Sequence, residues 1–161
     1  MDDVIATGFI GDDFTIIDKK AHLEHRNATR RGGYDALNLY FYSELPMSLG
    51  GQCTFPMHIE AGDIYNATID GCMVNGNVMP GLSTPFGEHN GRYAVHEAGH
   101  WFNLLHTFTG APCDLINDEV DDTPAQAGPS SGCSDPQTDT CPDLEGLDPI
   151  HNYMDYAGDS W

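Results

Sequence analysis

Three histidines and one glutamate, spaced as in a catalytic metal site, form the most informative segment of the sequence. His96 and His100 lie four residues apart, Glu97 follows the first of them, and His106 comes six residues after the second. On an α-helix, residues i and i+4 share a face, so both imidazoles can direct a ring nitrogen at one ion. Three neutral imidazoles leave one position of a tetrahedral zinc open for water. The segment therefore predicts a catalytic zinc site with metal ligands His96, His100 and His106 and with Glu97 as the general base.

A helix over about residues 91–103 must carry the first two histidines. Val95, Ala98 and Phe102 recur at helical spacing and form an apolar stripe, which we expect to pack against a core.

The third histidine requires the chain to leave this helix. Six further helical residues would carry His106 about 9 Å along the axis and onto another face. The chain must therefore turn back near residue 103, and Asn103 suits this turn because asparagine tolerates left-handed backbone angles. The alternative is that these are ordinary surface or core histidines beside a fortuitous glutamate. The third histidine and the Asn103 turn favour the metal site over that alternative.

The extended zinc motif is followed by further segments that together resemble a known family. They are Thr107-Phe108, then Asp121-Asp122-Thr123-Pro124-Ala125, then Asn152-Tyr153-Met154-Asp155-Tyr156. The chain from about Tyr34 to its last residue resembles the pappalysin branch of the metzincin metallopeptidases, and within it the secreted fungal extracellular metalloproteases. The usual metzincin pattern has glycine at the position of Asn103, a mild change because both residues tolerate the left-handed conformation.

The resemblance implies a fold and two further roles. The fold is α+β, a zincin-like catalytic domain with a small twisted mixed sheet, an active-site helix and an irregular C-terminal part. We expect residues 1–161 to form this single domain. Met154 would be the residue of a Met-turn, an apolar floor beneath the three histidines. Tyr156 would hydrogen-bond the oxyanion of the tetrahedral intermediate, a role that agrees with the value of donors aimed at developing charge.

The remaining elements follow from composition and from turn residues. Before the zinc motif we expect a helix that ends at Gly32-Gly33, two strands and a Gly- and Pro-rich loop, over residues 14–31, 37–42, 70–75 and 76–91. By the resemblance, the second strand would lie along the edge of the cleft and pair with extended substrate. From residue 107 onward we expect mostly irregular structure.

The charge of the chain is strongly acidic and unevenly distributed. Six basic against 25 acidic residues give a formal net charge of −19, which disfavours nucleic acid or anionic membrane as a partner. Residues 113–161 carry twelve acidic residues and no Lys or Arg. They form either a solvated acidic loop region or, since calcium needs several oxygen ligands, a Ca²⁺ site without EF-hand spacing. The candidate calcium ligands are Asp114, Asp118, Asp121, Asp122 and Thr123.

Five cysteines occur without any Cys-x-x-Cys pair, which favours disulfides in an oxidising compartment over a zinc ribbon or a thioredoxin-type site. The resemblance implies the pairs Cys53–Cys72 and Cys113–Cys141. It would pair Cys133 with the position held here by Trp161, so Cys133 is expected to lack its usual partner.

Secretion is expected from the resemblance and the cysteines. Residues from Met1 onward show no basic and apolar signal-peptide pattern, and relatives carry further segments at both ends, so we expect the chain to be truncated relative to the family. No apolar stretch approaches the length of a membrane span. Asn27 and Asn66 begin Asn-x-Thr sequons, which are compatible with a secreted glycoprotein.

The function predicted from the sequence is a secreted zinc endopeptidase, a monomer that hydrolyses proteins or peptides with metal-activated water and Glu97 as base. Two alternatives stay open at this point. One is a truncated, non-catalytic, zinc-binding secreted relative. The other is a metal-dependent hydrolase that acts on something other than peptides.

Overall fold

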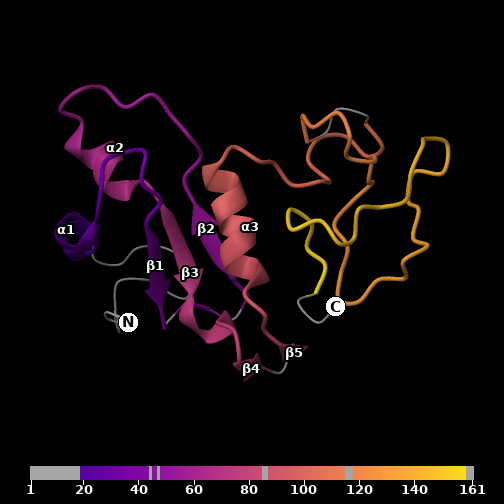
Figure 1. The fold of residues 1–161 in the computed structure, drawn as a ribbon, viewed down its shortest axis with the longest axis horizontal. Helices are drawn as coiled ribbons and strands as arrows, with labels where there is room; N and C mark the ends of the chain where they lie inside the picture. Colours follow the sequence, from indigo (N-terminus) through magenta and orange to yellow (C-terminus); the bar gives the residue numbers. More distant parts are fainter. Residues whose placement is uncertain (1–18, 44, 47, 85–86, 115–117, 159–161) are drawn as a thin grey trace.

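The computed structural model describes residues 19–158 except 44, 47, 85–86 and 115–117. Among them the structure is α+β, and every helix and strand lies in the first two thirds of the chain (Figure 1). The elements in order are α1 (Lys19–Thr29), β1 (Leu39–Tyr42), β2 (Gly51–Cys53), α2 (Ile64–Ile69), β3 (Cys72–Asn75), the 3₁₀ turn η1 (Gly76–Val78), β4 (Ser83–Thr84), β5 (Gly87–Glu88) and α3 (Arg92–Trp101).

A mixed sheet of three strands supports the helix that carries the zinc motif. The strand order is β1-β3-β2, with β1 parallel and β2 antiparallel to β3. The strand expected over residues 70–75 is therefore the central strand, and its expected place along the edge of the cleft is wrong. The edge beside α3 belongs to β2 (Figure 1). Strand order depends on which distant segment pairs with which, and local sequence does not encode it.

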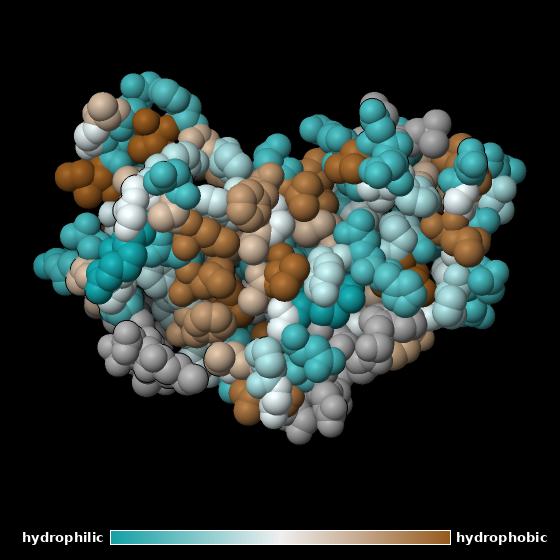
Figure 2. Space-filling view, viewed as in Figure 1, coloured by the Kyte–Doolittle hydropathy of each residue, from teal (hydrophilic) through white to brown (hydrophobic). Residues whose placement is uncertain are grey.

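The core of the sheet is built on aromatic residues of the first strand. Tyr40 and Tyr42 are buried with Leu45, and Leu49 and Met73 pack against them. Figure 2 shows apolar residues gathered over the sheet, whereas the C-terminal half presents mostly hydrophilic residues on this face. The hydrophilic surface of the C-terminal half agrees with the twelve acidic residues that the sequence places in residues 113–161.

Helix α1 matches the described part of the helix expected over residues 14–31; the remaining part, residues 14–18, lies outside the described residues. Gly32, with φ of +73°, takes a left-handed conformation just after it. A buried ion pair joins Arg30 Nη2 to Asp70 Oδ2 at 2.7 Å. Trp101 Nε1 donates to Asp70 Oδ1 at 2.9 Å, so this carboxylate ties α1 to the end of α3.

The segment between β3 and α3 is more ordered than the expected loop. It contains η1 and the short antiparallel pair β4–β5. No helix in the described part of the chain is long and apolar enough to cross a membrane.

The C-terminal half is irregular, as expected. From residue 102 on, the described residues form turns and one isolated bridge, Gly132–Ala157. The disulfide Cys113–Cys141 cross-links this half, and it is one of the two pairs that the resemblance implies. Cys133 lies exposed, outside both disulfides.

Candidate metal centre

Helix α3 buries its polar face. His96, Glu97 and His100 are all less than 9% exposed. Val95 and Phe102, expected to face a core, are 48% and 66% exposed, so the expected apolar packing is wrong. The helix packs against β2 and β3 instead through the side that carries Glu97, which lies against Gly51 and Cys72. Periodicity could not reveal this because the buried residues are polar.

The turn after the helix takes the conformation that the sequence predicted. Asn103 has φ of +70°. The Asn103 N–H donates to the His100 carbonyl and the Leu104 N–H to the Gly99 carbonyl, both at 2.9 Å, the two hydrogen bonds of a Schellman motif. This motif reverses the chain and returns His106 to the face of the helix.

The three imidazoles converge through their Nε2 atoms. The separations are 3.1 Å between His96 and His106, 3.2 Å between His96 and His100, and 3.0 Å between His100 and His106. Nitrogen ligands of a tetrahedral zinc lie about 3.3 Å apart, given zinc–nitrogen bonds of about 2.0–2.1 Å. Among the described residues, these histidines are the one group of His, Cys, Asp or Glu close enough to hold a metal ion.

Backbone carbonyls set the tautomers of two of these rings. His96 Nδ1 lies 2.7 Å from the Tyr153 oxygen, and His100 Nδ1 lies 2.8 Å from the Leu104 oxygen. A carbonyl can only accept, so Nδ1 carries the proton and, in the neutral ring, Nε2 keeps its lone pair. Two lone pairs pointing at one another at 3.2 Å repel unless a cation lies between them. The donor set thus fits zinc, and the carbonyls orient the rings as outer partners of metal ligands commonly do.

Burial favours the neutral, metal-binding form of the histidines. It lowers the pKa of His96, and it lowers the pKa of His106 to about 4, with smaller contributions from the neighbouring imidazoles. Protons therefore compete weakly with a metal ion at neutral pH.

Glu97 is buried between α3 and the edge strand β2. Burial raises the pKa of its carboxyl group to about 7, and a hydrogen bond from the Cys53 backbone opposes this rise. A Cβ added at Gly51 would lie 2.6 Å from Glu97 Cγ, so only glycine lets the strand approach this closely. A carboxyl group with a pKa near neutrality is suited to accept and return a proton.

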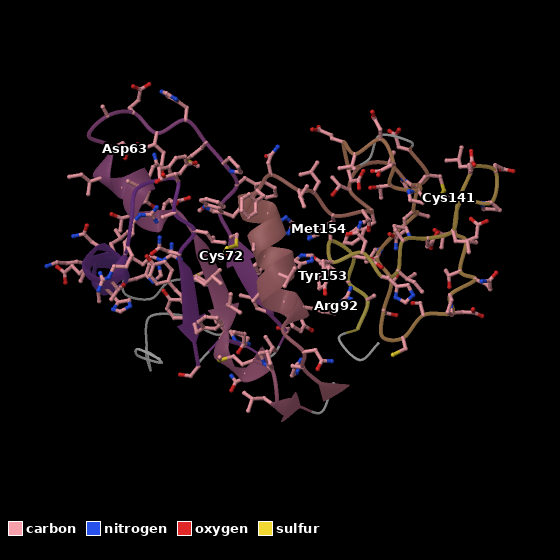
Figure 3. All side chains as sticks on the ribbon, viewed as in Figure 1. Asp63, Cys72, Arg92, Cys141, Tyr153 and Met154 are labelled. Atoms are coloured by element: carbon pink, nitrogen blue, oxygen red, sulfur yellow. A yellow bond between two sulfur atoms is a disulfide. The ribbon has the colours of Figure 1, made fainter. Side chains whose placement is uncertain are left out.

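A disulfide joins the two strands beneath the helix. Cys53 and Cys72 are directly opposite in the register of β2 and β3, and their pairing is the one that the resemblance implies. Cys72 Sγ lies 3.6 Å from the Glu97 carbonyl oxygen, and Figure 3 shows this disulfide between the sheet and α3.

The segment Asn152–Tyr156 lies against the other side of α3 (Figure 3). Met154 is buried, and a Cβ added at Gly99 would lie 2.3 Å from its sulfur. The ring of Tyr156 lies 4.8 Å from that of His106, between centroids, and lines the same cavity. Partial burial and the nearby Glu97 carboxylate raise the pKa of Tyr156, which keeps its hydroxyl protonated and able to donate.

Arg92 is a site residue that the sequence did not identify. Its Nη2 donates to the Asn152 carbonyl at 3.1 Å, and its guanidinium lies 4.6 Å from the centroid of the Tyr153 ring. Arg92 precedes His96 by one helical turn, so the two side chains hold consecutive carbonyls of one segment. The signal that could have found it is this i, i+4 spacing.

The histidines, Glu97 and Tyr156 line one cavity of about 890 Å³. One wall is the stretch from Ser48 to Cys53, which includes β2, and the opposite wall contains Tyr153 and Asp155–Ala157.

The expected calcium site gains no support. Asp118 is buried, and its Oδ1 accepts a hydrogen bond from the Val120 N–H. Asp114, Asp121 and Asp122 are exposed, and among the described residues only the three histidines lie close enough together to hold a metal ion. Calcium binding, with Thr123 as a further ligand, remains a prediction.

Comparisons with known proteins agree with this geometry. The sequence profile of the M43 peptidase family, described as pregnancy-associated plasma protein-A, matches residues 50–160. An extracellular metalloprotease of Pyricularia oryzae is 48% identical over 136 residues, which are 84% of this chain and 46% of the relative. One from Neurospora crassa is 44% identical over 157 residues, 93% of this chain and 52% of the relative. The chain thus spans about half the length of these curated relatives.

The fold is also similar to that of a solved peptidase. Mature mirolysin of Tannerella forsythia, solved in complex with a cleaved peptide, matches with a TM-score of 0.65 and 26% sequence identity. The match covers 89% of this chain and 54% of mirolysin. Since the family profile covers well over half of the sequence, the chain belongs to the M43, or pappalysin, family of metallopeptidases.

Proposed function

We propose that the chain is the zinc-binding part of a secreted endopeptidase that hydrolyses peptide bonds in proteins or peptides. The observation that carries this proposal is the convergence of three Nε2 atoms, 3.0–3.2 Å apart, beside the buried carboxyl group of Glu97. The names of the extracellular relatives and the two disulfides support secretion.

His96, His100 and His106 would hold the zinc ion. When bound, zinc would supply Lewis-acid polarisation of the scissile carbonyl and would lower the pKa of water. Glu97 removes a proton from the attacking water and then delivers it to the amine of the leaving peptide. Its raised pKa, about 7, suits both directions of transfer at neutral pH. Because water is the nucleophile, no covalent acyl-enzyme forms.

Tyr156 and Met154 have supporting roles in this proposal. The hydroxyl of Tyr156, held protonated by its raised pKa, donates a hydrogen bond to the negative charge that develops on the carbonyl oxygen. Met154 is the residue of the Met-turn, and its buried side chain packs under the zinc helix at Gly99.

The substrate binds as an extended strand along β2. This strand is at the edge of the sheet, and all three of its residues line the cavity. An extended peptide can add to such an edge through backbone hydrogen bonds, which explains how a peptidase binds many sequences. The complex of mirolysin with a cleaved peptide agrees with a peptide substrate for this fold.

Casein digestion by the purified chain tests the proposal, with a matched Glu97→Gln variant. We expect digestion that a chelator abolishes and zinc restores, and a variant that binds zinc as tightly as wild type but has lost nearly all activity. Zinc binding without any digestion by the wild-type chain would favour the non-catalytic alternative. Turnover retained by Glu97→Gln would remove Glu97 from the role of base.

A further inference from the structure

A buried polar network lies behind the third histidine and takes no part in the proposed chemistry. Thr107 and Gln126 are completely buried, and Asp155 is 4% exposed. Thr107 Oγ1 donates to Gln126 Oε1 at 2.7 Å, and Gln126 Nε2 donates to Asp155 Oδ1 at 3.2 Å. The amide of Gln126 therefore connects the residue after His106 with the residue after Met154.

Backbone groups close this network on both sides. The Thr107 N–H donates to the Met154 carbonyl at 3.3 Å, and the Ser130 N–H donates to Asp155 Oδ1 at 3.0 Å. Gln126 Nε2 also donates to Ser130 Oγ at 3.0 Å. Three segments that are distant in sequence thus meet at one glutamine.

The side chain of Gln126 is difficult to replace. Breaking one hydrogen bond would leave a buried donor or acceptor unsatisfied, at a cost of about 1–3 kcal/mol. Such networks consequently favour one arrangement of the backbone over its alternatives. His106 needs this restraint more than His96 and His100 do, because a loop carries it and no helix fixes its ring.

Asp155 has one carboxylate oxygen that the network does not use. Oδ1 accepts two hydrogen bonds, whereas Oδ2 is buried and no described residue donates to it. Asp155 lines the same cavity as His96 and His106, so its carboxylate lies close to the site that these imidazoles form. A negative charge there favours a metal cation held by the imidazoles.

We propose that Gln126 and Asp155 are positioning residues that set the zinc affinity of the three-histidine site. Gln126 holds His106 in register with the segment that follows Met154, and Asp155 anchors the glutamine and contributes negative charge toward the ion. This inference rests on the proposed zinc site, but it assigns roles to residues that do not touch the metal. Hydrogen-bonded partners beyond the ligands of a metal site typically change its affinity by about 10–100-fold.

The test measures zinc dissociation constants by competition with a chromophoric chelator. Thr107→Val removes the hydroxyl that donates to Gln126, while Thr107→Ser keeps it. Asp155→Asn removes the charge, and its matched control is Asp148→Asn. Asp148 is likewise buried, its Oδ1 also accepts two hydrogen bonds, from the backbone and the hydroxyl of Thr140, and it does not line the cavity.

Gln126→Leu is the more severe variant. If it fails to fold, the other variants and their matched controls at Thr107, Asp155 and Asp148 still test the proposal. For every variant, the melting temperature of the zinc-free protein separates loss of the site from general destabilisation. The visible spectrum of the cobalt-substituted protein reports the geometry of the ligands.

We expect Thr107→Val and Asp155→Asn to weaken zinc binding by about tenfold and to change the cobalt spectrum. The zinc dissociation constants of Thr107→Ser and Asp148→Asn should stay within about twofold of the wild-type value, whatever the melting temperatures of these variants. Wild-type affinity in both Thr107→Val and Asp155→Asn would overturn the inference and leave the zinc site intact. An equal loss in Asp148→Asn would also overturn it. Failure of the wild-type chain to bind zinc would overturn the proposed function and this inference together.

Discussion

Gly99 and Met154 are packed so closely that the helix has no room for a side chain at residue 99. A Cβ built there would lie 2.3 Å from the sulfur of Met154 and 3.2 Å from its terminal methyl carbon. This contact joins the helix of the first two histidines to the segment that contains Tyr156.

Substitution of Gly99 by alanine tests this contact, because its effect on the free energy of unfolding should change sign when Met154 is removed. In the wild-type background, Gly99→Ala should lower the free energy of unfolding by about 1–3 kcal/mol, because the methionine must move. In a Met154→Ala background the contact is gone, and the same change should stabilise by up to about 1 kcal/mol, since alanine favours helix over glycine. Urea unfolding of the double-mutant cycle measures both values. Additive effects would show that the two residues are not in contact.

Tyr156→Phe isolates the hydroxyl that we assign to the oxyanion. We expect kcat to fall by about 10²–10³-fold, the usual cost of removing one such donor. KM and zinc affinity should change little, because the ring and its contact with His106 remain. Steady-state kinetics on a fluorogenic peptide provide the measurement. An unchanged kcat would exclude the hydroxyl from the reaction.

Asp70 should contribute more to stability than Asp63, the aspartate at the other end of α2. Its carboxylate accepts from Arg30 and Trp101, and it is buried. Asp70→Ala leaves a mostly buried guanidinium without its counterion and should cost about 3–5 kcal/mol. The control is Asp63→Ala, which removes the N-cap hydrogen bond of α2 and should lower the free energy of unfolding by less than Asp70→Ala does. Equal losses in urea unfolding would contradict this account of Asp70.

His22 should make the fold sensitive to acid. Burial, with the nearby positive charge of Arg26, lowers the pKa of His22 to about 4. The unfolded chain binds this proton below pH of about 6.5, so stability is complete above that value and falls as pH decreases toward 4. The full shift corresponds to about 3 kcal/mol. Thermal unfolding of zinc-free wild type and of His22→Gln between pH 4 and 7 measures the difference in stability between the two proteins. This difference should shrink as the pH falls.

Parallel pH profiles of the two proteins would contradict the assigned role of His22.

The local parts of the site could be read from the sequence, but the long-range parts could not. Spacing placed His96 and His100 on one helical face, and the preference of asparagine for left-handed angles placed the turn at Asn103. Both inferences concern residues a few positions apart, where backbone geometry alone decides. The buried polar face of the helix was missed because hydrophobic periodicity pointed to Val95 and Phe102, which are exposed.

Strand order and the residues behind the ligands depend on tertiary pairing. The segment 51–53 is only three residues long and contains glycine, so nothing in it indicated the edge strand that covers Glu97. Gln126 lies in an irregular stretch without periodicity, and its role depends on Thr107 and Asp155, which are 19 and 29 residues away in sequence. Only the folded chain brings these groups together.

Titration of the metal-free chain with zinc, with peptide cleavage recorded at each step, tests whether the three-histidine site makes this chain a peptidase. We expect no turnover without metal, a linear rise in turnover with added zinc, and a break at one zinc per chain. Cleavage that proceeds at full rate in the absence of metal, or a chain that takes up one zinc and still cleaves nothing, would contradict it.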